Sequence, residues 1–461
     1  DARGKRPVDW LESYVLRHGV KPLGYRGLGR LAAAMLEREQ NLGLSMDEAE
    51  GLLEGVFTGP GGKSRVDAHD FLEDLAARGL LARHRDRVVF RHSLAAAYCA
   101  AIAAATEPEF VAPGENAAWA QALYFYASLG EMAPLVARQL GRAPDLLHSG
   151  LMASAHWLRD APPAARWRSD VLRQLSRLLT DPSLPAELRL RALGAFVVAG
   201  DPGAASLFKQ GLTHDDPLLR RIGALGLGTL GEHTAAPAIE AQLTDPQPEV
   251  RWAAALALGA MNHSSAADAL GTGLLTGDDE LRRACAEALA RDADTGHALL
   301  QEAITHADLS VRRAAVYGLA ATRAPWALKI IEDLQQTEKQ WYVRSAAQDV
   351  LARLAESDHR LPRAYAAPDS LGWLIAWAAK QGQSVPPGEA AVEVLYDALA
   401  DGGEPARRAA AEALGGLGQP TAARELYRLL RGANTALRDA AFRALAQIAA
   451  ASGQPLATPT A

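Results

Sequence analysis

The amino-acid sequence predicts a protein dominated by α-helices, in which a small N-terminal module precedes an α-solenoid. A helical motif that contains arginine recurs at intervals of about 30 residues, a period typical of stacked helical repeats. Aromatic residues make up only 6% of the 461 residues, and alanine and leucine supply most of the apolar content instead. Small apolar side chains favour closely packed helices over sheets.

The repeats fill the C-terminal part of the chain. Each period carries two apolar helical patterns, as in residues 250–261 followed by 266–275. A helix pair of this kind cannot bury its apolar face alone, so neighbouring pairs are expected to stack. The motif places an arginine near the start of each first helix. These arginines are predicted to be Arg189, Arg221, Arg251, Arg282, Arg312, Arg344, Arg407 and Arg438.

The arginine column is predicted to be structural. The residues just before the arginines are acidic or contain proline, as in "DDPLLR" and "GDDELR". An aspartate there can cap the first helix, because the unpaired N–H groups at a helix start favour negative charge. The arginine, one turn further, can bridge to an aspartate of the neighbouring repeat. We therefore interpret the column as an ion-pair ladder rather than as a phosphate-binding site.

The pattern D-P-x-x-x-V-R-x-x-A-x-x-A-L-G resembles the short HEAT-like repeats of the phycobilisome-lyase type, over residues 183–453. This resemblance implies a solenoid that binds a protein or peptide. The second helices of the periods, such as "AADALGTGLLTGD", are neutral to acidic, and we expect them to line the inner surface. Related arrays that bind DNA have basic inner faces. The neutral to acidic second helices of this chain therefore argue against a nucleic-acid ligand.

One repeat is degenerate, near residues 364–402, where Gly372 takes the position of the arginine. Aromatic side chains dominate both binding hot spots and cores. Two roles are therefore equally open for the aromatic residues near this repeat. They either pack within the interrupted repeat or bind a partner. The candidates for partner binding are Trp341, Tyr342, Trp373 and Trp377.

The N-terminal quarter has a different pattern and predicts a winged helix. Three helical segments are followed by two short extended runs around Arg85-Asp86, which is the winged-helix plan. The helical segments are 27–39, 45–57 and 67–81. We divide the chain into the end of an upstream helical region, the winged helix, a linker of helical hairpins and the solenoid, at residues 1–24, 25–110, 111–182 and 183–461.

The run "FTGPGGKS", residues 57–64, ends like a phosphate-binding P-loop but is not predicted to be one. The motif G-x-x-x-x-G-K-[ST] needs a glycine five positions before Gly62, where Phe57 stands. The preceding segment has helical spacing and a capping box, Ser45 to Glu48, instead of a buried strand. The run is therefore interpreted as a glycine-rich turn between two helices of the winged helix.

Residues 71–105 resemble the winged-helix end of NACHT-type STAND NTPases. A leucine-rich helix and "GLL" lead through a wing to Phe90, His92 and Tyr98. The family usually has Gln-Glu just before the aromatic residue, whereas this chain has Ala96-Ala97. With the helical hairpins that follow, the resemblance extends over residues 8–160.

That resemblance implies a role for His92. In the family the winged-helix histidine contacts the β-phosphate of ADP bound on the NTPase domain and holds the resting state. A purely structural role of His92 at a strand-to-helix junction is equally open. The chain begins at Asp1 rather than at Met, so we expect it to be part of a longer protein with an upstream NTPase domain. ATP or ADP is expected only with that domain, and no cofactor is expected in this chain.

The expected function is the regulatory and sensor part of a NACHT–HEAT signalling NTPase, with a protein trigger on the solenoid. The family resemblance adds antiphage defence, nucleotide-driven homo-oligomerisation and a cytoplasmic location as expectations. Two alternatives remain: a winged-helix DNA-binding regulator with a HEAT interaction domain, and a HEAT-type lyase or enzyme chaperone. The acidic third helix of the winged helix opposes the first of these.

Composition and residue spacing exclude several further classes of function and of site. The net charge of −6 opposes general binding to nucleic acid or to membrane surfaces. Cys99 and Cys285 stand far apart without a CxxC motif, so they predict buried thiols rather than a disulfide or a zinc site. The chain has no His-Glu dipeptide of the kind that HEAT-like di-iron hydroxylases use, and no metal site is predicted. The longest apolar stretch, residues 94–105, is too short to span a bilayer.

Overall fold

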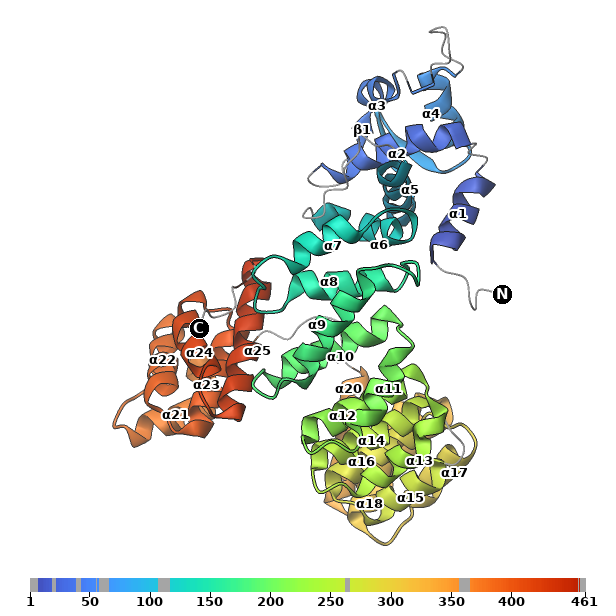
Figure 1. Ribbon diagram of the computed structural model, residues 1–461. Coiled ribbons are helices and arrows are strands. Elements are labelled where there is room, and N and C mark those ends of the chain that lie inside the picture. Colours follow the sequence, from blue (N-terminus) through green and yellow to red (C-terminus); the bar gives the residue numbers. More distant parts are fainter. Residues whose placement is uncertain are drawn as a thin grey trace. The chain divides into compact units, whose positions relative to one another are not determined.

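The computed structural model describes residues 7–18, 22–38, 43–54, 56–57, 66–106, 117–261, 266–355, 365–454 and 456. The chain divides into two compact units. Unit 1 comprises residues 1–144 and 148–174, and unit 2 comprises residues 145–147 and 175–461. Both units are mainly helical, as Figure 1 shows.

Unit 1 combines helices with one small sheet. Its elements are α1 (Pro7–Arg17), α2 (Pro22–Leu36), β1 (Leu44–Ser45), α3 (Met46–Leu53), α4 (Ala68–Ala77), β2 (Leu81–His84), β3 (Arg87–Phe90), α5 (Ser93–Thr106), η1 (Ala117–Trp119), α6 (Ala120–Leu129), α7 (Ala133–Leu140), α8 (Ser149–Leu158) and the first half of α9 (Arg168–Thr180).

The sheet of unit 1 is antiparallel, with strand order β1-β3-β2. The predicted hairpin around Arg85-Asp86 is present as β2 and β3, and Arg85 has a φ of 56° in its turn. Strand β1 was not predicted, because a two-residue strand has no periodicity; pairing of Leu44 with Val88 of the hairpin defines it. The capping box is confirmed: Ser45 accepts from the N–H of Glu48, whose carboxylate accepts from the N–H of Ser45.

Helix α5 contains the longest apolar stretch of the chain and forms the centre of unit 1. It packs against α2, α6 and α1. Gly29 of α2 allows close approach, since a Cβ added there would lie 2.5 Å from the Cβ of Ala103 on α5. Across the residues that the structure describes, no helix has both the length and the apolarity needed to cross a membrane.

Unit 2 is an α-solenoid of helix pairs. After the second half of α9 its elements are α10 (Ala186–Ala199), α11 (Gly203–Gly211), α12 (Pro217–Leu230), η2 (His233–Ala235), α13 (Ala236–Glu240), η3 (Ala241–Thr244), α14 (Pro248–Met261), α15 (Ala266–Thr276), α16 (Asp279–Leu289), α17 (Thr295–Ala303), α18 (Leu309–Thr322), α19 (Pro325–Thr337), α20 (Trp341–Ala355), η4 (Pro368–Ser370), α21 (Gly372–Lys380), η5 (Gly388–Ala390), α22 (Ala391–Asp401), α23 (Glu404–Gly416), η6 (Pro420–Ala422), α24 (Ala423–Leu430) and α25 (Thr435–Ser452).

The first helices of the repeats, α12, α14, α16, α18 and α20, pack directly on one another, more closely than the second helices do. Glycine allows this spacing. A Cβ on Gly228 of α12 would lie 2.6 Å from the Cα of Ala257 on α14, and one on Gly259 of α14 would lie 2.9 Å from the Cα of Ala288 on α16. The expectation that the second helices line the inner surface stays a prediction.

The C-terminal repeats join the stack ahead of the first one. Helix α25 packs against α10, and the Asp439 carboxylate accepts from the N–H of Ala186 at the start of α10, at 2.9 Å. Arg443 of α25 also lies 3.7 Å from the carboxylate of Glu187. The order of repeats in space thus differs from their order in the chain.

Candidate functional site

Ion pairs connect successive first helices. Arg189 pairs with Asp216 at 2.6 Å, Arg282 pairs with Asp308 at 3.0 Å, and Arg312 pairs with Glu338 at 3.3 Å. Arg251 pairs with Asp278 in the same way. Each arginine reaches the acidic residue that precedes the next first helix. These arginines have structural partners and are not available as a phosphate site.

The prediction for Arg221 was wrong, because its neighbour Arg220 makes the ion pair. Arg220 bonds Asp245 through two nitrogens, at 2.7 and 3.0 Å. Consecutive residues of a helix point about 100° apart, so only one arginine of an Arg-Arg pair can face the next repeat. Arg221 occupies the position one residue beyond the ladder.

The other three arginines predicted for the ladder form no ion pair among the described residues and bond carbonyl oxygens instead. Arg344 donates to the carbonyl of Glu338 at 2.9 Å, and Arg407 donates to that of Leu399 at 3.1 Å. Arg438 donates to the carbonyl of Pro182 at 3.3 Å, across the contact between α25 and α10.

The predicted helix caps are also present. Asp216, Asp278 and Asp308 accept backbone N–H groups at the starts of α12, α16 and α18. The hydrogen bond from the Ser310 N–H, aided by the charge of Arg282, holds the pKa of Asp308 below its ordinary value despite opposing desolvation. The Asp308 carboxylate thus both caps α18 and forms an ion pair with Arg282 of the preceding repeat.

The best-defined polar cluster on the remaining face of the first helices is a stack of arginine and tyrosine side chains. The guanidinium of Arg283 (α16) lies 4.3 Å from the ring centre of Tyr317 (α18). The guanidinium of Arg313 lies 5.9 Å from that ring and 4.3 Å from the ring of Tyr342 (α20). We call these four residues, Arg283, Tyr317, Arg313 and Tyr342, the Arg–Tyr stack. It crosses three successive repeats.

Hydrogen bonds hold the centre of the stack in place. Arg313 Nη1 donates to the hydroxyl of Tyr342 at 2.6 Å, and this hydroxyl donates to Asp279 at 3.2 Å. Burial opposes the charge of Arg313, but the interactions with Tyr342 and Tyr317 together outweigh it and raise the pKa of Arg313 above its ordinary value. Arg313 therefore carries a positive charge at every physiological pH.

Two of the four predicted aromatic candidates belong to this surface. Trp341 begins α20 with 69% of its surface exposed, and its ring lies 6.0 Å from that of Tyr342, edge to face. Trp373 and Trp377 are half-buried on a different helix, α21, which packs against α22 and α23. The structure thus brings Trp341 and Tyr342 together and places Trp373 and Trp377 elsewhere in the repeats.

The stack lines a shallow hollow of about 160 Å³, together with Asp279, Glu280 and Ser310. Pockets for cofactors and drug-sized ligands measure roughly 300–1,000 Å³. A hollow of this size admits one or two side chains of a partner. Its charged and aromatic lining is typical of protein-interface hot spots.

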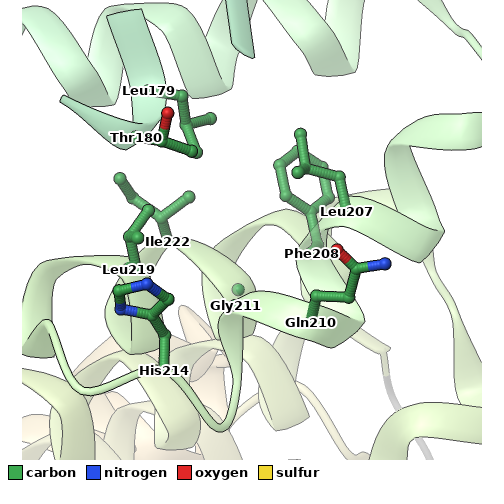
Figure 2. Close-up of a pocket in the computed structure, with 10 residues that line it drawn as sticks. Leu179, Thr180, Leu207, Phe208, Gln210, Gly211, His214, Leu219 and Ile222 are labelled. Atoms are coloured by element: carbon green, nitrogen blue, oxygen red, sulfur yellow. The ribbon is translucent and has the colours of Figure 1, made fainter. Parts of the chain in front are cut away.

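A second recess lies between α9, α11 and α12, with a volume of about 100 Å³. Figure 2 shows Leu179 and Thr180 on one side, opposite Leu219 and Ile222, with Leu207 and Phe208 beside them. Its lining is mostly apolar, and it is smaller than the hollow at the stack. We interpret it as a packing gap between helices.

His92 lies at the exposed junction between β3 and α5. Its carbonyl accepts the N–H groups of Ala95 and Ala96, and its ring lies 5.7 Å from that of Tyr14, edge to face. The carbonyl of His92 thus stabilises the first turn of α5, which is a structural role at the strand-to-helix junction. The imidazole is also accessible from outside the unit.

The surface of α4 does not favour a nucleic-acid groove. Asp67 caps the helix, and Asp70 and Asp74 are exposed along it. Arg83, part of the basic run in the hairpin, forms an ion pair with Glu73 of α4. The electrostatic attraction to phosphates that a DNA-binding helix needs is therefore weak here.

The P-loop-like run lies almost entirely outside the described residues, which omit 58–65. Phe57 is described and is buried, with its ring 4.8 Å from that of Phe71. The residue at the glycine position of the motif therefore belongs to the core of unit 1.

Both cysteines are free and buried, and burial raises the pKa of Cys99 and of Cys285 to about 12. Within the described ranges, no group of three or more His, Cys, Asp or Glu side chains is arranged to hold a metal ion.

Comparisons with known families identify the repeats. Residues 205–290 and 273–352 match HEAT repeats, and residues 406–432 match the PBS lyase HEAT-like repeat. The first two matches fall on helix pairs that the ion pairs connect, and the third falls on α23 and α24. No curated protein matches the chain.

Similar solved structures include human deoxyhypusine hydroxylase in complex with glycerol, at 23% identity, 61% of this chain, 98% of that chain and a TM-score of 0.30. The CpcE–CpcF complex of phycocyanin lyase from a Nostoc species matches at 20% identity, 53% of this chain, 94% of that chain and a TM-score of 0.25. Yeast importin-β matches at 15% identity, 94% of this chain, 63% of that chain and a TM-score of 0.34.

Proposed function

We propose that unit 2 is a protein-recognition solenoid and that its partner binds over the first helices α16, α18 and α20. The observation that carries this proposal is the exposure of Trp341 beside the Arg–Tyr stack. Tryptophan, tyrosine and arginine are the residues most enriched in interface hot spots. Trp341 has 69% of its surface exposed to water, so a partner that covers it would bury a large aromatic area.

The dimensions of this surface support a protein partner over a small substrate. The hollow is too small for a cofactor, while the helices around it form a continuous surface across several repeats. A lyase or enzyme-chaperone role would need a larger pocket than either this hollow or the recess between α9, α11 and α12 provides.

Site-specific photo-cross-linking tests the proposal. We would place benzoylphenylalanine at Trp341 in the full protein, expressed in its source cells, and at Leu275 as the control. Leu275 is also exposed, at 46%, but lies on the second helix α15. A discrete adduct formed from position 341 and absent from position 275 supports recognition at this surface. Equal labelling, or no adduct at either position, contradicts it.

For unit 1 we propose a winged helix that regulates a NACHT-type NTPase, with His92 contacting ADP on an NTPase domain of the same protein. Two features support this: three helices and a hairpin in the winged-helix order, and the accessible imidazole of His92 after β3. An imidazole N–H bound to a phosphate would form a charge-assisted hydrogen bond that favours the ADP state. Antiphage defence, a cytoplasmic location and nucleotide-driven homo-oligomerisation remain part of this proposal.

Nucleotide retention tests the role of His92. In the full protein, His92→Ala should release bound ADP faster, whereas His84→Ala should not. His84 is the matched control because it is an exposed histidine on β2 of the same unit. The chain of residues 1–461 alone should not bind ADP. Unchanged ADP release from His92→Ala would remove the proposed nucleotide contact.

A further inference from the structure

Arg313 differs from the arginine that precedes it. Arg312 faces the next repeat and pairs with Glu338, whereas Arg313 faces outward between the rings of Tyr317 and Tyr342. Among the described residues no acidic side chain forms an ion pair with Arg313; its Nη1 bonds Tyr342, and its Nε is buried without a hydrogen-bond partner. A half-buried guanidinium held between two aromatic rings therefore retains unused hydrogen-bond donors.

The repeat places similar groups on the neighbouring helices. The position one residue beyond the ladder arginine is Arg221 on α12, Arg283 on α16 and Arg313 on α18. Arg283 is 47% exposed, and in the part of the chain that the structure describes its ion pair is with Glu287 of its own helix. Exposed pairs of this kind contribute little free energy, so a partner carboxylate can replace Glu287 at small cost.

We propose that the Arg–Tyr stack binds an extended acidic segment of a partner protein, with one carboxylate on Arg313, the next on Arg283 and an aromatic side chain against Trp341. This rests on the proposed function of unit 2 and specifies its partner. A guanidinium fork binds a carboxylate through two parallel hydrogen bonds, and its position on a tyrosine ring keeps it oriented. The approximate volume of 160 Å³ suits a carboxylate side chain.

The spacing of the helices sets the spacing of the carboxylates. Packed helices lie about 8–10 Å apart. An extended or polyproline II chain advances roughly 3.1–3.4 Å per residue and returns to the same face in about three residues in the polyproline II form. Acidic residues at every third position therefore match arginines on neighbouring helices.

The acidic residues around the hollow disfavour a continuous polyanion relative to a peptide with spaced carboxylates. Asp279 and Glu280 line it, and Glu287 flanks Arg283. A peptide with isolated carboxylates can place neutral residues next to these groups. A nucleic-acid strand, with a charge on every phosphate, would be repelled by them.

A peptide of repeating Glu-Ser-Tyr triplets, labelled with fluorescein, is the probe. We expect fluorescence anisotropy to show saturable binding to the full chain. A peptide of the same composition with its glutamates adjacent should bind more weakly, and a Lys-Ser-Tyr peptide should not bind. Single-stranded DNA and inorganic phosphate should not displace the probe. Displacement by either one, or equal binding of the lysine peptide, would overturn the proposal.

Variants locate the site. Arg313→Gln should weaken binding by about tenfold or more, since it removes a charge-assisted contact. Arg283→Gln should weaken it less, and Tyr342→Phe should have an intermediate effect by releasing Arg313. The matched control is Arg408→Gln, because Arg408 is exposed at the same repeat position on α23, outside the stack. Equal affinity of Arg283→Gln, Arg313→Gln and Arg408→Gln contradicts the proposal.

The two proposals fail separately. A position-341 adduct combined with no binding of the Glu-Ser-Tyr probe keeps protein recognition and eliminates the acidic segment. Circular dichroism melting of each variant identifies any that does not fold. Arg283→Gln, which alters a half-exposed side chain, then provides the decisive comparison.

Discussion

Asp216 connects two repeats through a single carboxylate: it accepts the N–H of Leu218 at the start of α12 and pairs with the buried guanidinium of Arg189 at 2.6 Å. The Arg189 side chain is only 3% exposed, and it also donates to the carbonyl of Leu179 at 2.8 Å. Removing the carboxylate would leave a buried charge without its partner. This geometry makes the ladder a source of stability for unit 2.

Asp216→Ala should therefore destabilise unit 2 by about 3 kcal/mol, from the stranded arginine and the lost helix cap together. Asp215→Ala is the matched control, because Asp215 is the preceding residue and is exposed. It should change stability by less than about 0.5 kcal/mol. Urea unfolding followed by circular dichroism measures both values, and equal effects would show that the ladder does not stabilise the stack.

Two glycines should respond to alanine in opposite directions. Gly228→Ala should destabilise by about 1–3 kcal/mol, because the new Cβ would lie 2.6 Å from the Cα of Ala257. Gly194→Ala, within α10, meets no atom within 4 Å and should stabilise by about 0.5–1 kcal/mol through helix propensity. Thermal melting distinguishes them. Stabilisation by both substitutions would contradict the close packing of α12 and α14.

The contribution of Asp308 should depend on pH. Its folded-state pKa lies below the ordinary value because of the Ser310 N–H and the charge of Arg282. A lowered folded pKa gives stability that is present above the unfolded pKa of about 4 and is lost as the pH falls through the folded value. The stability difference between wild type and Asp308→Asn should be constant above about pH 6 and shrink toward about pH 3.

Asparagine at position 308 can still cap α18, so this difference reports the charge. Urea midpoints across the pH series provide the measurement. A difference that grows with acidity has the wrong sign for a carboxylate stabilised in its charged form.

Both thiols should be unreactive in the native protein. Burial raises the pKa of Cys99 and of Cys285 to about 12, so the thiolate that attacks disulfide reagents is scarce as well as shielded. Ellman's reagent at neutral pH should label neither residue in the folded chain and both in guanidinium chloride. Rapid labelling of Cys99 alone would show that α5 opens locally.

Much of the repeat architecture was predictable because its signals are local and recur. The spacing of the arginines and the alanine-rich helices specified helix pairs, and the aspartates before them specified the caps at α12, α16 and α18. The Ser45–Glu48 capping box and the hairpin at Arg85 were likewise local patterns. Strand β1 has no comparable pattern, since its pairing partner Val88 lies far along the chain.

The candidate site was predicted only in part. Trp341 and Tyr342 stood out as aromatic residues in an aromatic-poor chain, but Arg313, Tyr317 and Arg283 did not. A signal was available in the Arg-Arg pairs at 282–283 and 312–313. One arginine of each pair forms the ion pair with the next repeat, and the second arginine takes no part in that ion pair. The same ambiguity led to Arg221 in place of Arg220.

The sequence by itself determined where helices begin, which faces are apolar and that the helices form a repeating stack, because these depend on neighbouring residues. Only the tertiary structure decided which arginine of each pair faces the next repeat, which layer packs more closely, and that α25 lies against α10. It also decided that Tyr317 and Tyr342 enclose Arg313. These outcomes depend on the rotation and spacing of whole helices. Contacts between side chains that are far apart in the chain set both.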